Sequence, residues 1–208
     1  MSRFSQAISE GDGISVIPLL EGDVAELAAM AEEAGAEAIA VWSLREVEQV
    51  RSRCSLPVLV REPDFNLEGN LRFLSTAAAD ACVVIFSRFG EDEGLLEGLY
   101  EGIQQDTVDC VVEVRDDEEL RETLERVDPE IFLIAEREPE KDWQELERTL
   151  DLLPDVPAGK LVISEAGVVA REQVVALERA GVDALLVGPT FLQDFPAALA
   201  VLTGRAET

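Results

Sequence analysis

Two glycines near the end of the chain stand where a backbone could bind a phosphate group. Gly167 lies in the segment Lys160–Val168, where an apolar run is followed by a glycine-containing loop, and Gly188 follows a second apolar run, Asp183–Val187. Because glycine has no Cβ atom, an anion can approach the backbone N–H groups closely. If the two runs are the last strands of a (β/α)8 barrel, their loops form the position at which such barrels commonly bind phosphate.

Short apolar runs alternate with amphipathic stretches along the whole chain. The runs predicted to be strands are residues 14–20, 37–42, 56–61, 80–86, 108–114, 130–135, 161–164 and 183–187. The stretches predicted to be helices are residues 23–34, 44–53, 67–78, 91–103, 117–127, 142–153, 171–180 and 192–202. Continuous apolar strands between helices are typical of a parallel sheet buried on both faces. The pattern predicts one domain over residues 1–208, a TIM barrel with eight parallel strands alternating with eight helices; an open doubly wound sheet is the alternative.

The net charge of −27, from 44 acidic and 17 basic residues, disfavours anionic partners. Such a surface repels nucleic acid and anionic membranes, so we expect neither as a partner. Two of the basic residues are lysines, and acidic residues occur in every predicted helix. This pattern resembles proteins adapted to high cytoplasmic salt, where screening removes self-repulsion, and an ordinary acidic protein is the alternative. No apolar run reaches the length of a membrane span and the first residues lack a signal-peptide core, which predicts a cytoplasmic protein.

The residue types present limit the possible chemistry. The chain has no histidine, so catalysis by imidazole and metal binding by imidazole are excluded. Cys54, Cys82 and Cys110 are widely spaced and are predicted to be buried thiols, not a disulfide framework or a metal site. We expect no metal and no cofactor. An aldolase that forms a Schiff base is disfavoured, because neither Lys141 nor Lys160 follows a predicted strand.

Segments throughout the chain resemble the indole-3-glycerol phosphate synthase family. They are Phe4–Ile17, Leu56–Leu59, Val111–Leu120, Ile131–Arg137, Ile163–Val168 and Leu186–Gly188. The pieces around predicted strands 5 and 7 are the most specific in combination, and related phosphate-binding barrels share the glycine loops. The resemblance implies a carboxy-lyase barrel of tryptophan biosynthesis. The family's reaction protonates a carbonyl, closes a ring, expels carbon dioxide and loses water.

The resemblance implies a site at the carboxyl ends of the strands. Glu113 stands where the family has an acid–base carboxylate after strand 5, Arg137 matches an arginine after strand 6, and Glu165 matches a carboxylate after strand 7. Gly167 and Gly188 match the glycines that bind phosphate. Each residue also has a structural interpretation: Glu113 could be a solvated strand-end acid, Arg137 could pair with either glutamate, and the glycines could serve turns.

The chain departs from the family at residues that carry its chemistry. Leu19 and Glu21 stand where the family has a glutamate and a lysine, and Arg61 is the cation nearest to the position of the general-acid lysine after strand 3. Burial can tune a lysine to release a proton near neutral pH, but it cannot do so for arginine. Ala135 and Ala166 replace an asparagine and a serine. We expect the family's loop after strand 2 and its N-terminal extension to have no counterpart in this barrel.

Three functions remain open. The first is a divergent, catalytically impaired indole-3-glycerol phosphate synthase-like barrel, with Glu113, Glu165, Arg137 and Arg61 at the catalytic positions and phosphate bound after strands 7 and 8. The second is a non-catalytic barrel that binds a metabolite or a protein. The third is another small-phosphosugar isomerase or lyase that uses Glu113 and Glu165 as base and acid. A phosphorylated small molecule is the expected ligand, and the sequence leaves turnover and oligomeric state open.

Overall fold

Eight parallel strands form the centre of the molecule. The computed structural model describes residues 2–11, 13–61, 78–90, 92, 94–105, 107–135, 145–165, 167–168, 170–189 and 194–205. The strands are β1 (Ser15–Pro18), β2 (Ile39–Val41), β3 (Val58–Val60), β4 (Ala81–Ile85), β5 (Asp109–Val114), β6 (Ile131–Ala135), β7 (Leu161–Glu165) and β8 (Ala184–Val187). They follow the order β1-β8-β7-β6-β5-β4-β3-β2. A bridge between Leu19 and Ala40 joins the two ends of the sheet. The predicted TIM barrel is therefore confirmed.

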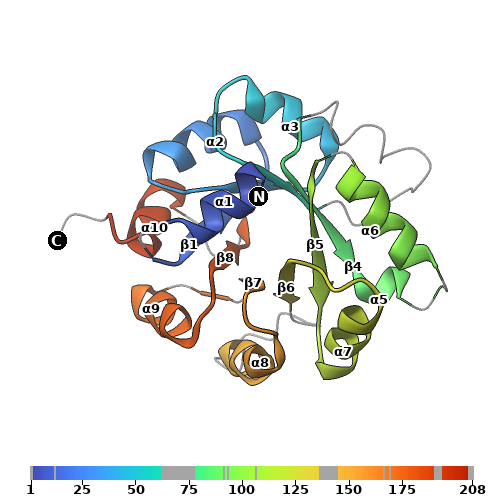
Figure 1. Ribbon diagram of the computed structural model, residues 1–208. Helices are drawn as coiled ribbons and strands as arrows, with labels where there is room; N and C mark the ends of the chain where they lie inside the picture. Colours follow the sequence, from blue (N-terminus) through green and yellow to red (C-terminus); the bar gives the residue numbers. More distant parts are fainter. Residues whose placement is uncertain are drawn as a thin grey trace.

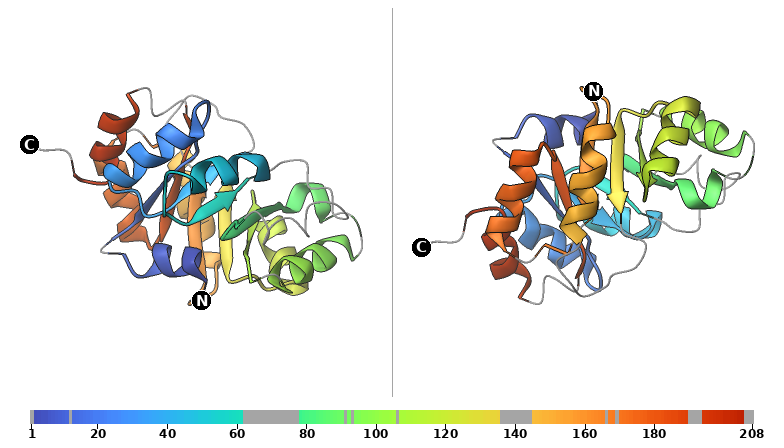
Figure 2. Two further views of the ribbon diagram at one scale, coloured as in Figure 1. Left: turned by 90° about the horizontal axis from the view of Figure 1, so that it is seen from above. Right: turned by 90° about the horizontal axis from the view of Figure 1, so that it is seen from below.

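Helices surround the strands (Figures 1 and 2). They are α1 (Arg3–Ser9), α2 (Val24–Glu33), α3 (Leu44–Arg51), α5 (Phe86–Phe89), α6 (Leu95–Gln105), α7 (Asp117–Arg126), α8 (Glu145–Leu152), α9 (Arg171–Ala180) and α10 (Phe195–Leu202), with a 3-10 turn η1 (Leu153–Asp155) after α8. Most of the predicted helix over residues 67–78 lies outside the described residues. The helix predicted from residue 91 begins at Leu95, after the short helix α5. Within the described residues, no helix is long and apolar enough to cross a membrane.

Successive strand residues face two separate cores. Ile17, Val111 and Ile163 belong to the core inside the barrel. Their neighbours Val16 and Val112 belong to the core between the strands and the helices. This alternation follows from the two-residue period of a strand. It determines which side chains reach the interior of the barrel where the strands end.

Helix α1 was not predicted from the sequence, and it closes the amino-terminal end of the barrel (Figure 1). Phe4 and Ile8 are 0% and 2% exposed and pack into the core inside the barrel. They are four residues apart, so they lie on one face of the helix. The side chain of Ser2 caps the helix by accepting the N–H of Phe4 at 3.1 Å. The helix thus fills the end of the barrel opposite to the carboxyl ends of the strands.

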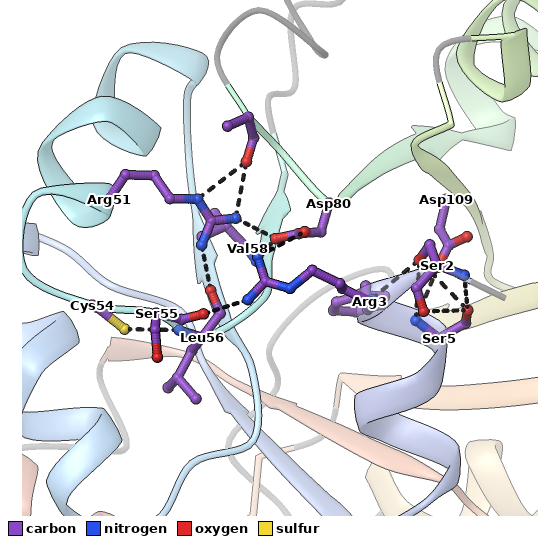
Figure 3. A network of polar contacts seen from close by, with 12 residues as sticks. Ser2, Arg3, Ser5, Arg51, Cys54, Ser55, Leu56, Val58, Asp80 and Asp109 are labelled. Carbon is purple, nitrogen blue, oxygen red and sulfur yellow. Dashed lines mark hydrogen bonds and ion pairs between the residues drawn. The ribbon is translucent and has the colours of Figure 1, made fainter.

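Two aspartates connect α1 to neighbouring parts of the barrel at this amino-terminal end (Figure 3). Asp80 accepts the N–H of Val58 at 2.8 Å. It also binds the guanidinium of Arg51 and forms an ion pair with Arg3 of α1 at 3.6 Å. Asp109 accepts the N–H of Ser5 at 2.9 Å. One carboxylate therefore joins α3, β3 and α1.

We expect Asp80→Asn to lower the free energy of unfolding by about 1–3 kcal/mol, the range for removing hydrogen bonds to a partly buried charged group. The measurement is urea unfolding at a fixed molar potassium chloride concentration. Asp151→Asn on the exposed face of α8 is the matched control. Equal stability of Asp80→Asn and the control variant would show that this connection does not stabilise the barrel.

Candidate functional site

Four inward-facing side chains form one layer at the carboxyl ends of alternate strands. They are Leu19 after β1, Arg61 after β3, Glu113 in β5 and Glu165 at the end of β7. A barrel interior is filled by such layers, each with one side chain from every second strand. Here three of the four members carry charge. Leu19 is 2% exposed and belongs to the apolar core inside the barrel.

Arg61 holds both carboxylates of this layer. Its Nε donates to Glu165 Oε1 at 3.2 Å and its Nη2 donates to Glu165 Oε2 at 2.5 Å. The same Nη2 lies 3.0 Å from Glu113 Oε2. Among the described residues Oε2 of Glu113 has no hydrogen bond of ordinary geometry, so this last contact is an ion pair and not a directed bond. The guanidinium therefore bridges β5 and β7 across the mouth of the barrel.

A second arginine, the first residue after β5, also binds Glu113. Arg115 donates from Nε at 3.0 Å and from Nη2 at 2.8 Å, both to Glu113 Oε1. The two residues are two positions apart, so their side chains leave the strand on the same face. The side chain of Glu113 is 0% exposed, whereas that of Arg115 is 27% exposed. We call Arg115, Glu113, Arg61 and Glu165 the mouth cluster.

The mouth cluster keeps Arg61 protonated. Burial alone would lower the pKa of its guanidinium, but attraction by Glu165 and then Glu113 outweighs burial, so the pKa of Arg61 lies above its usual value. The cluster contains two arginines and two glutamates, which gives it no net charge. Its order along the contacts is Arg115, Glu113, Arg61 and Glu165, so unlike charges alternate.

The structure brings together three of the four predicted catalytic positions, Arg61, Glu113 and Glu165. The fourth, Arg137, lies outside the described residues, so its predicted ion pair with a glutamate is not tested. Arg115 was not predicted to be a site residue. The signal was nevertheless present, because the i, i+2 spacing from Glu113 predicts that both side chains share the inner face of β5.

Gly167 and Gly188 follow neighbouring strands. β7 pairs with β8 in parallel, with Ile163 opposite Ala184 and Ser164 opposite Leu185. Their carboxyl ends therefore lie at the same edge of the barrel, and both glycines are partly exposed there. Gly167 comes two residues after Glu165, so this edge adjoins the mouth cluster.

The lysine and cysteine side chains described here lie away from the mouth. Lys160 precedes β7 and binds Asp128 at 3.1 Å and Glu130 at 3.2 Å, at the opposite end of the barrel. Cys54, Cys82 and Cys110 are buried free thiols, as predicted. Within the described part of the chain, no group of three or more cysteine, aspartate or glutamate residues is arranged to hold a metal ion.

The fold and the charged layer at its mouth define the class, a (β/α)8 barrel with a candidate site at the carboxyl ends of its strands. The family model for indole-3-glycerol phosphate synthase matches residues 18–201. The chain therefore belongs to the indole-3-glycerol phosphate synthase family.

Two curated relatives share this family name. The indole-3-glycerol phosphate synthase of Acidithiobacillus ferrooxidans is 35% identical over 144 residues, which are 69% of this chain and 53% of the relative. That of an Acidovorax species is 33% identical over 147 residues, 71% of this chain and 54% of the relative. The chain thus spans about half the length of these relatives.

Solved structures of similar fold include mutant tryptophan synthase alpha-subunits from Pyrococcus furiosus. One has a TM-score of 0.69 at 18% identity and covers 91% of this chain and 98% of its own. A second has a TM-score of 0.70 at the same 18% identity. At this level of identity the likeness concerns the fold alone.

Proposed function

We propose that this barrel binds a phosphorylated small molecule of the tryptophan-biosynthetic type at the carboxyl ends of β7 and β8, with lyase turnover absent or very low. Membership of the indole-3-glycerol phosphate synthase family supports the ligand class. The observation that carries the proposal is the bridge from Arg61 to both Glu113 and Glu165. In this bridge, the groups that would transfer protons, the guanidinium of Arg61 and the two carboxylates, bind one another.

The chemistry of arginine argues against turnover. Ring closure and dehydration need an acid that gives up its proton near neutral pH. Arg61 occupies the mouth with a pKa raised further by its two carboxylate partners, and a guanidinium stays protonated in proteins. Leu19, where the resemblance expects a glutamate, adds an apolar side chain to the same layer.

The same contacts weigh against an isomerase that uses Glu113 and Glu165 as base and acid. Such an enzyme needs two carboxylates whose surroundings differ enough to favour opposite protonation states. Here one guanidinium binds both, and Arg115 binds Glu113 as well. Both carboxylates therefore face the same guanidinium, and the charges around them are alike.

Anion binding does not need those side chains as direct ligands. Backbone N–H groups beside Gly167 and Gly188 would donate to a phosphate whatever residues surround them. Glu165 precedes this edge and would repel a dianion, but its bonds to Arg61 offset that repulsion. The loss of the acid and the retention of a phosphate site are therefore compatible.

We expect the protein to bind inorganic phosphate or a ribose phosphate weakly, with a dissociation constant in the millimolar range, about −4 kcal/mol. Gly188→Asp should abolish this binding, because its carboxylate places both bulk and negative charge at the edge. Gly98→Asp on α6 is the matched control, since a Cβ there meets nothing within 4 Å. Titration calorimetry in molar potassium chloride measures all three proteins.

Two outcomes would contradict the proposal. Phosphate binding that survives in Gly188→Asp would place the site elsewhere. Formation of indole-3-glycerol phosphate from its open-chain carboxylated precursor at ordinary enzymatic rates, about 1 s⁻¹ or faster, would show that an arginine-bridged mouth still catalyses. The turnover assay uses the same high-salt buffer.

A further inference from the structure

The position of Arg115 in the fold does not by itself require its side chain to contact Glu113. It follows β5 and precedes α7, with 27% of its side chain exposed. An arginine at such a position could extend into solvent. Instead it turns back along β5 and places Nε and Nη2 on a single buried oxygen, Glu113 Oε1.

The two oxygens of Glu113 are divided between two arginines. Oε1 accepts from Arg115, and Oε2 faces Arg61 Nη2 at 3.0 Å. This division opposes rotation of the carboxylate about its last bond, because a partial turn would move each oxygen away from its arginine. It also leaves Nε and Nη2 of Arg61 aligned with Glu165.

The backbone of Arg115 is itself held on both sides. Its N–H donates to Glu119 Oε2 at 2.8 Å, and Glu119 is only 7% exposed. Its carbonyl accepts from Arg148 Nη1 of α8 at 3.3 Å. The start of the Arg115 side chain is thereby fixed, so less conformational entropy is lost when its guanidinium binds Glu113.

Removing Arg115 would change both geometry and charge. Glu113 Oε1 would be buried without its donors, and the carboxylate could satisfy both oxygens only by drawing on Arg61. Arg61 would then share its donors with Glu165 less well. The remaining three members would carry one net negative charge beside the edge where Gly167 and Gly188 lie, which disfavours an anion there.

We propose that Arg115 is a positioning residue: by holding Oε1 of Glu113, it orients Arg61 toward Glu165 and keeps the mouth of the barrel neutral for an anionic ligand. The orientation of Arg61 is a property of the protein without ligand. The effect on an anionic ligand rests on the proposed function. The orientation of Arg61 and the binding of an anion are therefore measured separately.

The first readout is the Nε–H signal of Arg61 in ¹H–¹⁵N NMR spectra of the unliganded protein in molar potassium chloride. The signal is assigned by its loss in Arg61→Lys. In Arg115→Gln we expect its exchange with deuterated water to become about tenfold faster, because a charge-assisted hydrogen bond to Glu165 is weakened. Arg115→Lys, which keeps the charge but donates through one nitrogen, should give a smaller increase.

Arg121→Gln, on the exposed face of α7, is the control for loss of an arginine near the site. It should leave the Arg61 signal unchanged. An unchanged Arg61 signal in Arg115→Gln would overturn the proposal, as would equal changes in Arg115→Gln and Arg121→Gln. If Arg115→Gln does not fold, Arg115→Lys decides: unchanged Arg61 exchange in that variant overturns the proposal.

The second readout is binding of inorganic phosphate. We expect Arg115→Gln to weaken it about fivefold or more, because one positive charge near the edge is lost, while Arg121→Gln has little effect. Equal weakening in both variants would mean that only overall charge matters and would overturn the charge-balancing role. A wild-type protein that binds no phosphate refutes the proposed function, whereas the Arg61 signal still tests the positioning role.

Discussion

Replacing Glu113 by glutamine is expected to lower the free energy of unfolding by about 3–5 kcal/mol, the usual cost of removing one partner from a buried ion pair. Glutamine has nearly the same shape, so the loss is one of charge. Glu113 is 0% exposed and binds Arg61 and Arg115. Its neutralisation leaves the mouth cluster with one uncompensated positive charge among buried side chains.

Glu165→Gln is the matched control, because this glutamate binds Arg61 too but is 25% exposed. Water can replace part of what Glu165 supplies, so a loss of about 1 kcal/mol is expected, as for a pair near the surface. Urea unfolding of both variants, at one fixed salt concentration, makes the comparison. Equal losses in the two variants would mean that burial does not decide the strength of these pairs.

The mouth cluster is a poor way to stabilise a barrel. Buried ion pairs often contribute no more stability than apolar residues of similar volume, because desolvation offsets their attraction. The layer could have been filled with side chains like that of Leu19, which already belongs to the apolar core. Charged residues at the carboxyl ends of β3, β5 and β7 therefore fit a binding site better than a purely structural role.

The strands could be predicted from the sequence because they are continuous apolar runs. Each described strand lies within its predicted range or extends it by one residue, as β7 does by ending at Glu165. Helix α1 was missed, although a serine at residue 2 and apolar residues four apart, Phe4 and Ile8, are signals of a short capped helix. A run of seven residues is too short for periodicity alone to identify.

The contacts between the site residues were harder to predict from the sequence than the residues themselves. Arg61 and Glu165 are 104 positions apart in the sequence. Their contact depends on how far neighbouring strands are displaced along one another around the barrel, and composition does not reveal that displacement. The sequence placed Arg61 and Glu165 at the same end of the barrel but did not predict the contact that the structure shows between them.

The melting temperature is expected to rise by about 10 °C between low salt and molar potassium chloride, or about 3 kcal/mol for a domain of this size. The net charge of −27 places like charges on neighbouring helices. Their repulsion extends over a Debye length of about 30 Å at 0.01 M salt but only about 3 Å at 1 M. A midpoint that stays constant or falls with added salt would refute adaptation to high salt.

Screening and general effects of salt on the protein surface can be separated by removing charge. Glu48, Glu101 and Glu125 are exposed on three different helices, α3, α6 and α7. Replacing all three by glutamine should raise the melting temperature at low salt and reduce its rise with salt, because less repulsion remains to be screened. A general surface effect of potassium chloride would instead leave the slope unchanged in the variant. The buried pairs of Glu113 are screened far less than surface charges, so Glu113→Gln should keep most of its cost at every salt concentration.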